Sequence, residues 1–279
     1  MPKFTQQIVV FLDILGFSNM IPSFEKEALD NNISSENNYH ESEALNKLIS
    51  IFKDSIELIK TAECNYYLFS DNLCITVDYI ENETEQPNVL VEILTLISLL
   101  MKEFVQEGYF LRGGVDAGWF LDSRDLAVGQ PLVQAYLLES KIAVYPRVVV
   151  STNFQNVLTD YIKKNKLTDY SAFLSEKYLK KDGDLTYLDP FFYIVNFEDK
   201  EGKLDYLSTY SRHIYQKLNA YKKDEKVGPK YIWFANQFNT FVDVYIADSA
   251  YLELDNEQLD YSSQEIDFIK NLKLDINAL

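Results

Sequence analysis

The sequence predicts an α+β fold in which an antiparallel sheet carries helices on one of its faces. β-rich runs and helical patterns alternate over residues 8–151 in the order β-α-β-β-α-β-α-β, a ferredoxin-like arrangement. Hydrophobic residues make up 47% of the 279 residues and aromatic residues 14%, enough for a substantial core. No Gly/Ser-rich or Pro-rich linker divides the chain, so we expect a single domain over residues 1–279, with its core at 8–151 and a mainly helical C-terminal extension at about 152–279.

The first half of the core contains two strand regions separated by a helix. Residues 9–13 are apolar up to a final aspartate and predict a buried strand. Residues 22–43 are polar and predict an exposed loop that could include a short helix, whereas residues 44–60 repeat apolar side chains at helical spacing. Two β-rich runs flank the turn-prone residues Ser70-Asp71-Asn72 and therefore predict a hairpin.

The second half of the core contains two more helices and two more strands. Residues 88–108 predict a long, mostly buried helix that a glycine ends. Residues 109–120 predict a strand, and its three glycines are typical of bulges or of places where a ligand or backbone comes close. A helix with proline in its first turn is expected at 131–143, and a strand follows at 147–151.

The extension after residue 151 has a weaker pattern. Residues 153–166, 202–223 and 229–246 are predicted helices, and residues 187–197 predict a strand that Pro190 interrupts. Aromatic side chains of the last helix could bury a dimer interface, although a monomer core needs such residues equally. They are Tyr231, Trp233, Phe234 and Phe238.

The composition argues against several classes of partner. The chain has 43 acidic and 26 basic residues, and its net charge of −17 repels nucleic acid and anionic lipid but allows a small phosphorylated ligand. No apolar run reaches about 18 residues and the N-terminal residues lack a signal-peptide pattern, so we expect no membrane partner and a cytoplasmic location. Cys64 and Cys74 are expected to be free thiols, and neither His40 nor His213 is expected to be catalytic.

Two aspartates are the candidate functional residues. Asp13 ends the first strand and Asp71 lies in the hairpin turn, so a βαββ arrangement can bring the two side chains together. Adjacent carboxylates repel each other unless a cation is present, and Mg²⁺ commonly binds one or two carboxylates plus substrate phosphates. Backbone amides after Gly16 could contact phosphates without obstruction by a side chain. In the alternative interpretation, Asp71 only stabilises its turn and Asp13 caps the next segment.

In this order, the motifs resemble the catalytic domain of the class III nucleotidyl cyclases. The first family motif, Asp-Ile-x-Gly-Phe-Thr/Ser, is similar to Asp13–Ser18, and the second metal-binding Asp of the family lies in the turn that holds Asp71. The Arg-x-Gly-Ile-x-x-Gly strand resembles Arg112–Gly118, and the helix after it resembles Gly129–Glu139. The resemblance covers roughly residues 8–151 and implies the class III cyclase fold.

The resemblance also implies a reaction and a cofactor. A nucleoside triphosphate would be converted to its 3′,5′-cyclic monophosphate and pyrophosphate, at active sites on the interface of a homodimer. Two Mg²⁺ or Mn²⁺ ions would be bound by Asp13, Asp71 and the carbonyl oxygen of Ile14. Gly16 and Phe17 would lie against the phosphates of the substrate.

The helix at 131–143 departs from the family pattern. The family positions of an Asn and an Arg, which contact the ribose and the phosphates, hold Val133 and Leu137, and neither can do so. Gln134 is adjacent to the first position and Lys141 lies one turn beyond the second, so we expect these two to act from the partner subunit. Two other cations are expected near the site, Arg112 as a substrate contact and Arg147 as a catalytic group. Which of Lys141, Arg112 and Arg147 replaces the missing Arg stays open.

The base-selecting position also departs from the purine cyclases. Tyr67 stands where a purine-selecting Lys usually lies, four residues before Asp71. Together with the missing Asn and Arg, it resembles the bacterial uridylate and cytidylate cyclases of the Pycsar antiphage systems, which implies UTP or CTP as substrate and a second-messenger role in antiphage defence. Two alternatives remain open. One is a catalytically inactive cyclase-fold nucleotide sensor or dimer scaffold, and the other is a different palm-type phosphotransferase.

Overall fold

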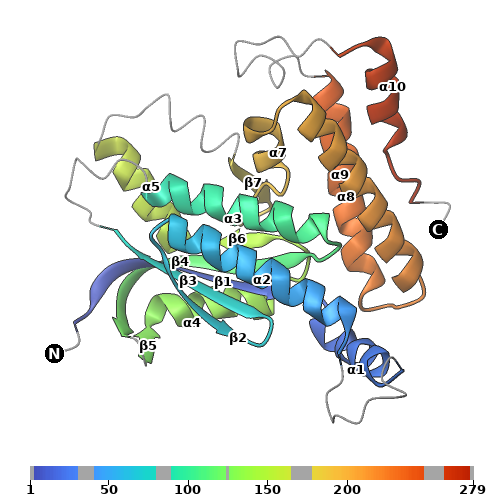
Figure 1. Ribbon diagram of the computed structural model, residues 1–279. Helices are drawn as coiled ribbons and strands as arrows, with labels where there is room; N and C mark the ends of the chain where they lie inside the picture. Colours follow the sequence, from blue (N-terminus) through green and yellow to red (C-terminus); the bar gives the residue numbers. More distant parts are fainter. Residues whose placement is uncertain are drawn as a thin grey trace.

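One sheet of eight strands organises the structure (Figure 1), a computed structural model that describes residues 3–30, 41–79, 89–123, 126–164, 178–247 and 261–276. The strands are β1 (Thr5–Ile14), β2 (Asn65–Phe69), β3 (Asn72–Asp78), β4 (Leu111–Ser123), β5 (Leu126–Gly129), β6 (Val148–Val150), β7 (Leu179–Asp182) and β8 (Leu185–Leu188). They lie in the order β2-β3-β1-β4-β6-β8-β7, with β5 paired to β4. The extension therefore adds β7 and β8 to the sheet that the core begins.

The helices are distributed over both faces and one side of the sheet. They are η1 (Phe17–Asn19), α1 (Ile21–Asp30), α2 (Glu43–Thr61), α3 (Val89–Gln106), α4 (Gln130–Leu137), the π-helical turn η2 (Leu138–Ile142), α5 (Thr152–Lys164), α7 (Phe192–Phe197), α8 (Lys200–Tyr221), α9 (Gly228–Ala247) and α10 (Ser263–Asn271). The mixed α+β class predicted from the sequence is confirmed.

The sheet is not purely antiparallel, so this part of the prediction is wrong. The pair β4–β6 is parallel, with Gly113 opposite Val148, whereas the other pairs of described strands are antiparallel. A parallel pair needs a long crossover, and here α4 and η2 provide it between β5 and β6.

Helices cover both faces of the sheet, whereas the sequence predicts them on one face (Figure 1). Ile8, Val10 and Leu12 of β1 pack in one cluster with α2, α3 and α5. Val9, which points the opposite way, packs in a second cluster with Ala135 of α4. A strand that is apolar on both faces has to be covered on both, and β1 is buried on both faces over residues 8–10.

The aromatic residues of the extension form a core of their own within the chain. Tyr231, Phe234 and Phe238 of α9 are buried in a cluster with residues of α7, α8 and α10. The indole of Trp233 stacks on Tyr145, with ring centroids 4.9 Å apart and planes 7° apart. These four aromatic side chains therefore pack against other residues of the same chain, as they would in the core of a monomer.

Other sequence expectations are corrected or lie beyond the described residues. The strand predicted over residues 187–197 is wrong after its first residues, because β8 ends at Leu188 and the chain forms α7 after Pro190. α1 occupies the start of the predicted polar loop, and residues 31–40, including His40, lie outside the described residues. Cys64 and Cys74 are free thiols. Within the described ranges, no helix is both long and apolar enough to cross a membrane.

Gly114 of β4 lets α4 pack closely on the sheet, and substitution should show it. A Cβ atom at this position would overlap the carbonyl oxygen of Ala135 and lie 2.6 Å from Cβ of Leu138. We expect Gly114→Ala to lower the free energy of unfolding by about 1–3 kcal/mol, measured by urea denaturation. The matched control is Gly202→Ala in α8, where the nearest atom is the flexible end of Glu198 and stability should be unchanged or slightly higher. Equal effects of the two substitutions would contradict this packing.

Candidate active site

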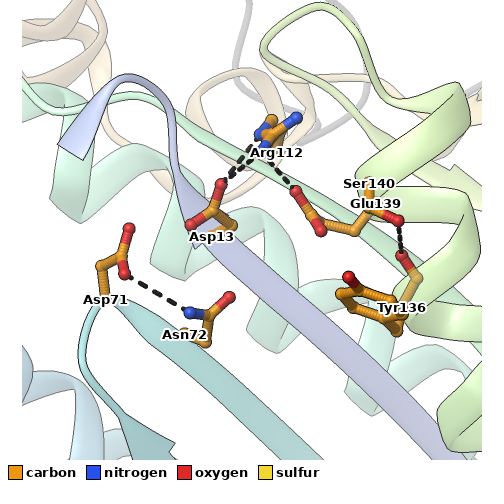
Figure 2. A network of polar contacts seen from close by, with 7 residues as sticks. All are labelled: Asp13, Asp71, Asn72, Arg112, Tyr136, Glu139 and Ser140. Carbon is orange, nitrogen blue, oxygen red and sulfur yellow. Dashed lines mark hydrogen bonds and ion pairs between the residues drawn. The ribbon is translucent and has the colours of Figure 1, made fainter. Parts of the chain in front are cut away.

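The register of the sheet brings Asp13 and Asp71 together (Figure 2). Asp13 is the penultimate residue of β1, and the preceding residue, Leu12, pairs with Leu73 of β3. Asp71 is in the two-residue turn that joins β2 to β3, where Ser70 adopts a left-handed conformation with φ 59°. The two carboxyl groups therefore meet at one end of the strands, although 57 residues separate them in the sequence.

The pKa values of both carboxyl groups are raised above their ordinary values. Burial, the hydrogen bond with Asp13 and the charge of Asp13 together raise the pKa of Asp71 to about 6. Burial also raises the pKa of Asp13, although hydrogen bonds from Asp71 and Arg112 oppose that shift. Above this pH the pair consists of two adjacent, partly buried carboxylates, which favours the binding of a cation.

A half-buried arginine neutralises part of this negative charge (Figure 2). Arg112 lies directly across from Asp13 on β4, and its Nε and Nη2 atoms donate to Oδ2 of Asp13 at 2.9 and 2.7 Å. Nη2 also lies 2.7 Å from Oε1 of Glu139, whose side chain is almost fully buried in the π-helical turn η2. One guanidinium thus contacts the carboxyl groups of Asp13 and Glu139, and the carboxyl group of Asp71 lies next to Asp13. When all three are ionised, negative charge is in excess over the single positive charge of Arg112.

Sequence reasoning missed the part that Glu139 plays here. In the sequence, this residue serves only to align the helix with the family motif. Its burial raises its pKa, and the charge of Arg112 opposes that shift. A glutamate in a helical pattern gives no sign that it faces the sheet, because the π-helical turn that redirects the chain is not visible in the periodicity.

The donor set fits a hard divalent cation. Carboxylate and carbonyl oxygens are the ligands of Mg²⁺ and Mn²⁺, and the raised pKa of Asp71 beside Asp13 is consistent with a place where a cation is favoured. Across the described part of the chain, no group of three or more His, Cys, Asp or Glu side chains is arranged to hold one ion. The residues therefore fit a site of two carboxylates whose other ligands are backbone, water and substrate oxygens.

Three predicted site residues follow Asp13 along the chain. Ile14 ends β1 and pairs with Leu111 of β4. Gly16 has φ 79°, and a Cβ atom there would have no neighbour within 4 Å, so the backbone borders open space. Phe17 begins η1 and packs against Phe24 of α1. The left-handed Gly16 lets the chain leave the strand in a tight turn beside the two aspartates.

Tyr67 lies on the face of the sheet that carries α4. It packs with Phe11 of β1 in the cluster on that face, and Phe11 and Asp13 point to the same side because they are two residues apart. The side chain of Tyr67 is half-buried, and its hydroxyl donates to Asp122 of β4. Tyr67 pairs with Cys74, which pairs with Phe11, so it lies on the same face as Asp13 and two residues further from the end of β1.

The two predicted site residues of the helix at 131–143 lie at the surface of the protein. Gln134 is half-buried, and Lys141 is exposed in η2. Val133 and Leu137, at the family positions of Asn and Arg, are also exposed. Within the described ranges, no hydrogen bond or ion pair connects these side chains to Asp13 or Asp71.

Arg147 lies in a different environment from the aspartate pair. Its guanidinium is buried and pairs with Asp182 of β7 at 2.7 Å. The rings of Tyr145, Tyr187 and Trp233 surround it, each with its centroid 5.2–5.3 Å away. These contacts join β7, β8 and α9, so the structure shows a cation that is engaged in packing the extension against the sheet.

Lys230 is a cation that sequence reasoning missed. It lies half-buried in the first turn of α9, next to Tyr231, whose ring contacts Phe110 with centroids 5.4 Å apart. Phe110 is two residues before Arg112, so α9 begins beside the site. Burial and the charge of Arg112 lower the pKa of Lys230, and the charge of Asp13 opposes this. Lys230 lies outside the region of resemblance, and a lysine near a helix start gives no other signal.

Comparison with known proteins finds similarity only among solved structures. No family model and no curated protein matches the chain. The adenylyl cyclase CyaB from P. aeruginosa is similar with a TM-score of 0.40 and 14% identity, over 57% of this chain and 83% of that chain. The guanylyl cyclase domain of the RhoGC fusion protein from the aquatic fungus Blastocladiella emersonii gives 0.40 and 13%, over 66% and 94%. The guanylyl cyclase Cya2 gives 0.42 and 10%, over 67% and 93%.

The raised pKa of Asp71 predicts a pH-dependent stability difference. A carboxyl with a folded pKa of about 6 and an unfolded pKa near ~4 destabilises the folded chain progressively as the pH rises between these values. Asp71→Asn should therefore raise the melting temperature by a few degrees at pH 7–8 in the presence of a chelator, and the gain should vanish towards pH 4. Thermal unfolding across this range tests it, with the exposed Asp54→Asn as control. A gain that is the same at every pH would contradict the raised pKa of Asp71.

The arginine bridge predicts non-additive effects of substitution. Arg112→Met leaves Asp13 and Glu139 without their counter-charge, and we expect a loss of about 3–5 kcal/mol in the free energy of unfolding at pH 7.5. Adding Glu139→Gln should restore part of that loss, because one buried charge is then removed. Urea denaturation of the single and double variants gives the coupling. A double variant that is less stable than Arg112→Met would show that Glu139 is not held by this ion pair.

Proposed function

We propose that the protein is a nucleotidyl cyclase that converts a nucleoside triphosphate to its 3′,5′-cyclic monophosphate and pyrophosphate. The observation that carries the proposal is the meeting of Asp13 and Asp71 at the end of β1, with Arg112 on the adjacent strand. Both aspartates stand at the metal-binding positions of the motifs that resemble class III cyclases. A purely structural role gives no reason for two adjacent carboxyl groups that destabilise the folded chain at neutral pH.

The residues of the chain supply positioning and charge in this reaction. When bound, Mg²⁺ or Mn²⁺ would neutralise the triphosphate and make the ribose 3′-hydroxyl more acidic. Asp13, Asp71 and the carbonyl of Ile14 would hold two such ions. Arg112 fixes the orientation of Asp13 by donating twice to its Oδ2 atom. The 3′-oxygen then forms its bond to the α-phosphorus while the bond to pyrophosphate breaks, a step that depends on alignment more than on covalent chemistry.

In this proposal, several groups of the protein interact with the phosphates of the substrate. The backbone at Gly16 and Phe17 borders open space and lets phosphates approach closely. Lys230 of the same chain lies within the electrostatic range of Asp13 and Arg112, and we assign it to the triphosphate. Gln134 and Lys141 would act from the partner subunit. The contacts of Arg147 with Asp182 and three rings support a structural role for it in place of a catalytic one.

A homodimer with active sites at its interface is part of the proposal. The surface of α4 and η2, together with Val144 two residues after η2, exposes five sizeable apolar side chains, which is typical of an interaction surface. They are Val133, Tyr136, Leu137, Ile142 and Val144. Phe69, next to the turn that holds Asp71, is 82% exposed and adds apolar area at the site itself.

The substrate that we propose is a pyrimidine nucleotide, UTP or CTP. Tyr67 replaces the purine-selecting Lys of the family, and its ring lies on the same face as the aspartate pair. The resemblance to the Pycsar cyclases supports a cytoplasmic second-messenger role in antiphage defence.

Exposed Val133 and Leu137, in place of Asn and Arg, favour the second candidate function, a nucleotide sensor without turnover.

Product formation from each nucleotide tests the proposal. Purified protein is incubated with ATP, GTP, CTP or UTP and Mn²⁺, and cyclic products are measured by mass spectrometry. We expect cyclic UMP or CMP, and a decrease of about 10²-fold or more in Asp13→Asn and Asp71→Asn. Asp54→Asn serves as the matched control, with melting temperatures measured for every variant. Activity that survives both site substitutions would rule out the metal assignment, and nucleotide binding without product would indicate the sensor.

A further inference from the structure

Asp122 gathers three hydrogen-bond donors from two neighbouring strands. It lies near the end of β4 and is half-buried. One carboxylate oxygen accepts from the hydroxyl of Tyr67, and the other accepts from Oγ1 of Thr76 at 2.7 Å and Nδ2 of Asn65 at 3.3 Å. These donors belong to β2 and β3, so the carboxylate joins the end of β4 to the strands that form the hairpin of Asp71.

These contacts fix the direction in which the hydroxyl of Tyr67 donates. Besides Asp122, the nearest polar partner of this hydroxyl is the carbonyl oxygen of Ser123, at 3.0 Å. Both partners are acceptors, and a hydroxyl has a single hydrogen to donate. The hydrogen therefore points towards Asp122, since a bond to a carboxylate is the stronger of the two. The oxygen of Tyr67 can then only accept a hydrogen bond from any further group.

The phenol also remains protonated at neutral pH. Burial, and then the hydrogen bond and charge of Asp122, raise the pKa of Tyr67. Tyr67 is only half-buried, so part of its side chain faces the space on the α4 side of the sheet. The neighbouring Phe11 packs edge-on against Tyr136 of α4, with ring centroids 5.6 Å apart. An aromatic surface with one oriented acceptor thus lies on the face of the sheet to which Asp13 points.

We propose that Asp122 is a positioning residue that makes Tyr67 a hydrogen-bond acceptor for the base of the nucleotide. The inference rests on the proposed function and assigns a chemical requirement to the same site. The base must present an N–H group to Tyr67, as cytosine does with its 4-amino group and uracil with N3–H. A base that presents a carbonyl oxygen or a methylated nitrogen there would leave the oxygen of Tyr67 without a donor and would bind less well.

Base analogues that lack the donor test this requirement. The analogue of CTP without its 4-amino group and the analogue of UTP methylated at N3 are compared with the parent nucleotides. Dissociation constants are measured by calorimetry with Ca²⁺, and kcat and KM with Mn²⁺. We expect the wild-type protein to prefer the parent of its substrate over the analogue by about 3- to 10-fold, the effect of one hydrogen bond. The preference should fall to about 1-fold in Asp122→Asn and in Tyr67→Phe.

Thr76→Val is the matched control, because it removes another donor of the same carboxylate and leaves the bond from Tyr67 in place. If Asp122 only joins β4 to the hairpin, Asp122→Asn and Thr76→Val should lower the melting temperature and leave the preference for the parent nucleotide unchanged. That result would overturn the inference, as would a wild-type protein that makes cyclic product from parent and analogue equally well. A wild-type protein that binds no nucleotide and makes no product overturns the proposed function, and this inference with it.

Discussion

The repulsion between the carboxylates of Asp13 and Asp71 is the constraint on which the site depends. The pairing of β1 with β3 fixes where the hairpin turn lies, so the two groups meet whether or not their contact is favourable. Burial raises the pKa of both groups, and the hydrogen bond and charge of Asp13 add to the rise at Asp71, so the arrangement costs free energy at neutral pH. A penalty of this kind persists in a protein when the arrangement serves a purpose, and binding of a divalent cation would remove it.

The surrounding structure holds this arrangement without cancelling its charge. Arg112 is placed opposite Asp13 by the β1–β4 register, and Glu139 reaches the same guanidinium from the π-helical turn after α4. Close packing of α4 on Gly114 sets the position of that turn. The guanidinium balances one carboxylate, and the remaining negative charge makes this end of the sheet suitable for a cation, then for the phosphates that accompany it.

The sequence predicts local structure and the aspartate pair better than it predicts contacts between distant residues. Alternation of apolar and polar residues, turn residues and helical spacing identify most elements of the core and the long helices of the extension. β1 reads simply as a buried strand, which does not reveal that α4 covers its second face. Aromatic residues suit a strand and a helix equally, so the start of α7 is missed. The roles of Glu139, Lys230 and Asp122 depend on partners far away in the sequence, and no local pattern encodes them.

The central claim is that a divalent cation lies between the carboxyl groups of residues 13 and 71 when nucleotide is bound. The most direct test is a crystal structure of the protein with Mn²⁺ and a non-cleavable pyrimidine triphosphate, with the metal located by anomalous scattering. The account predicts manganese within direct coordination distance of both carboxylates and of phosphate oxygens. Nucleotide bound in the crystal with no metal at either aspartate would contradict it.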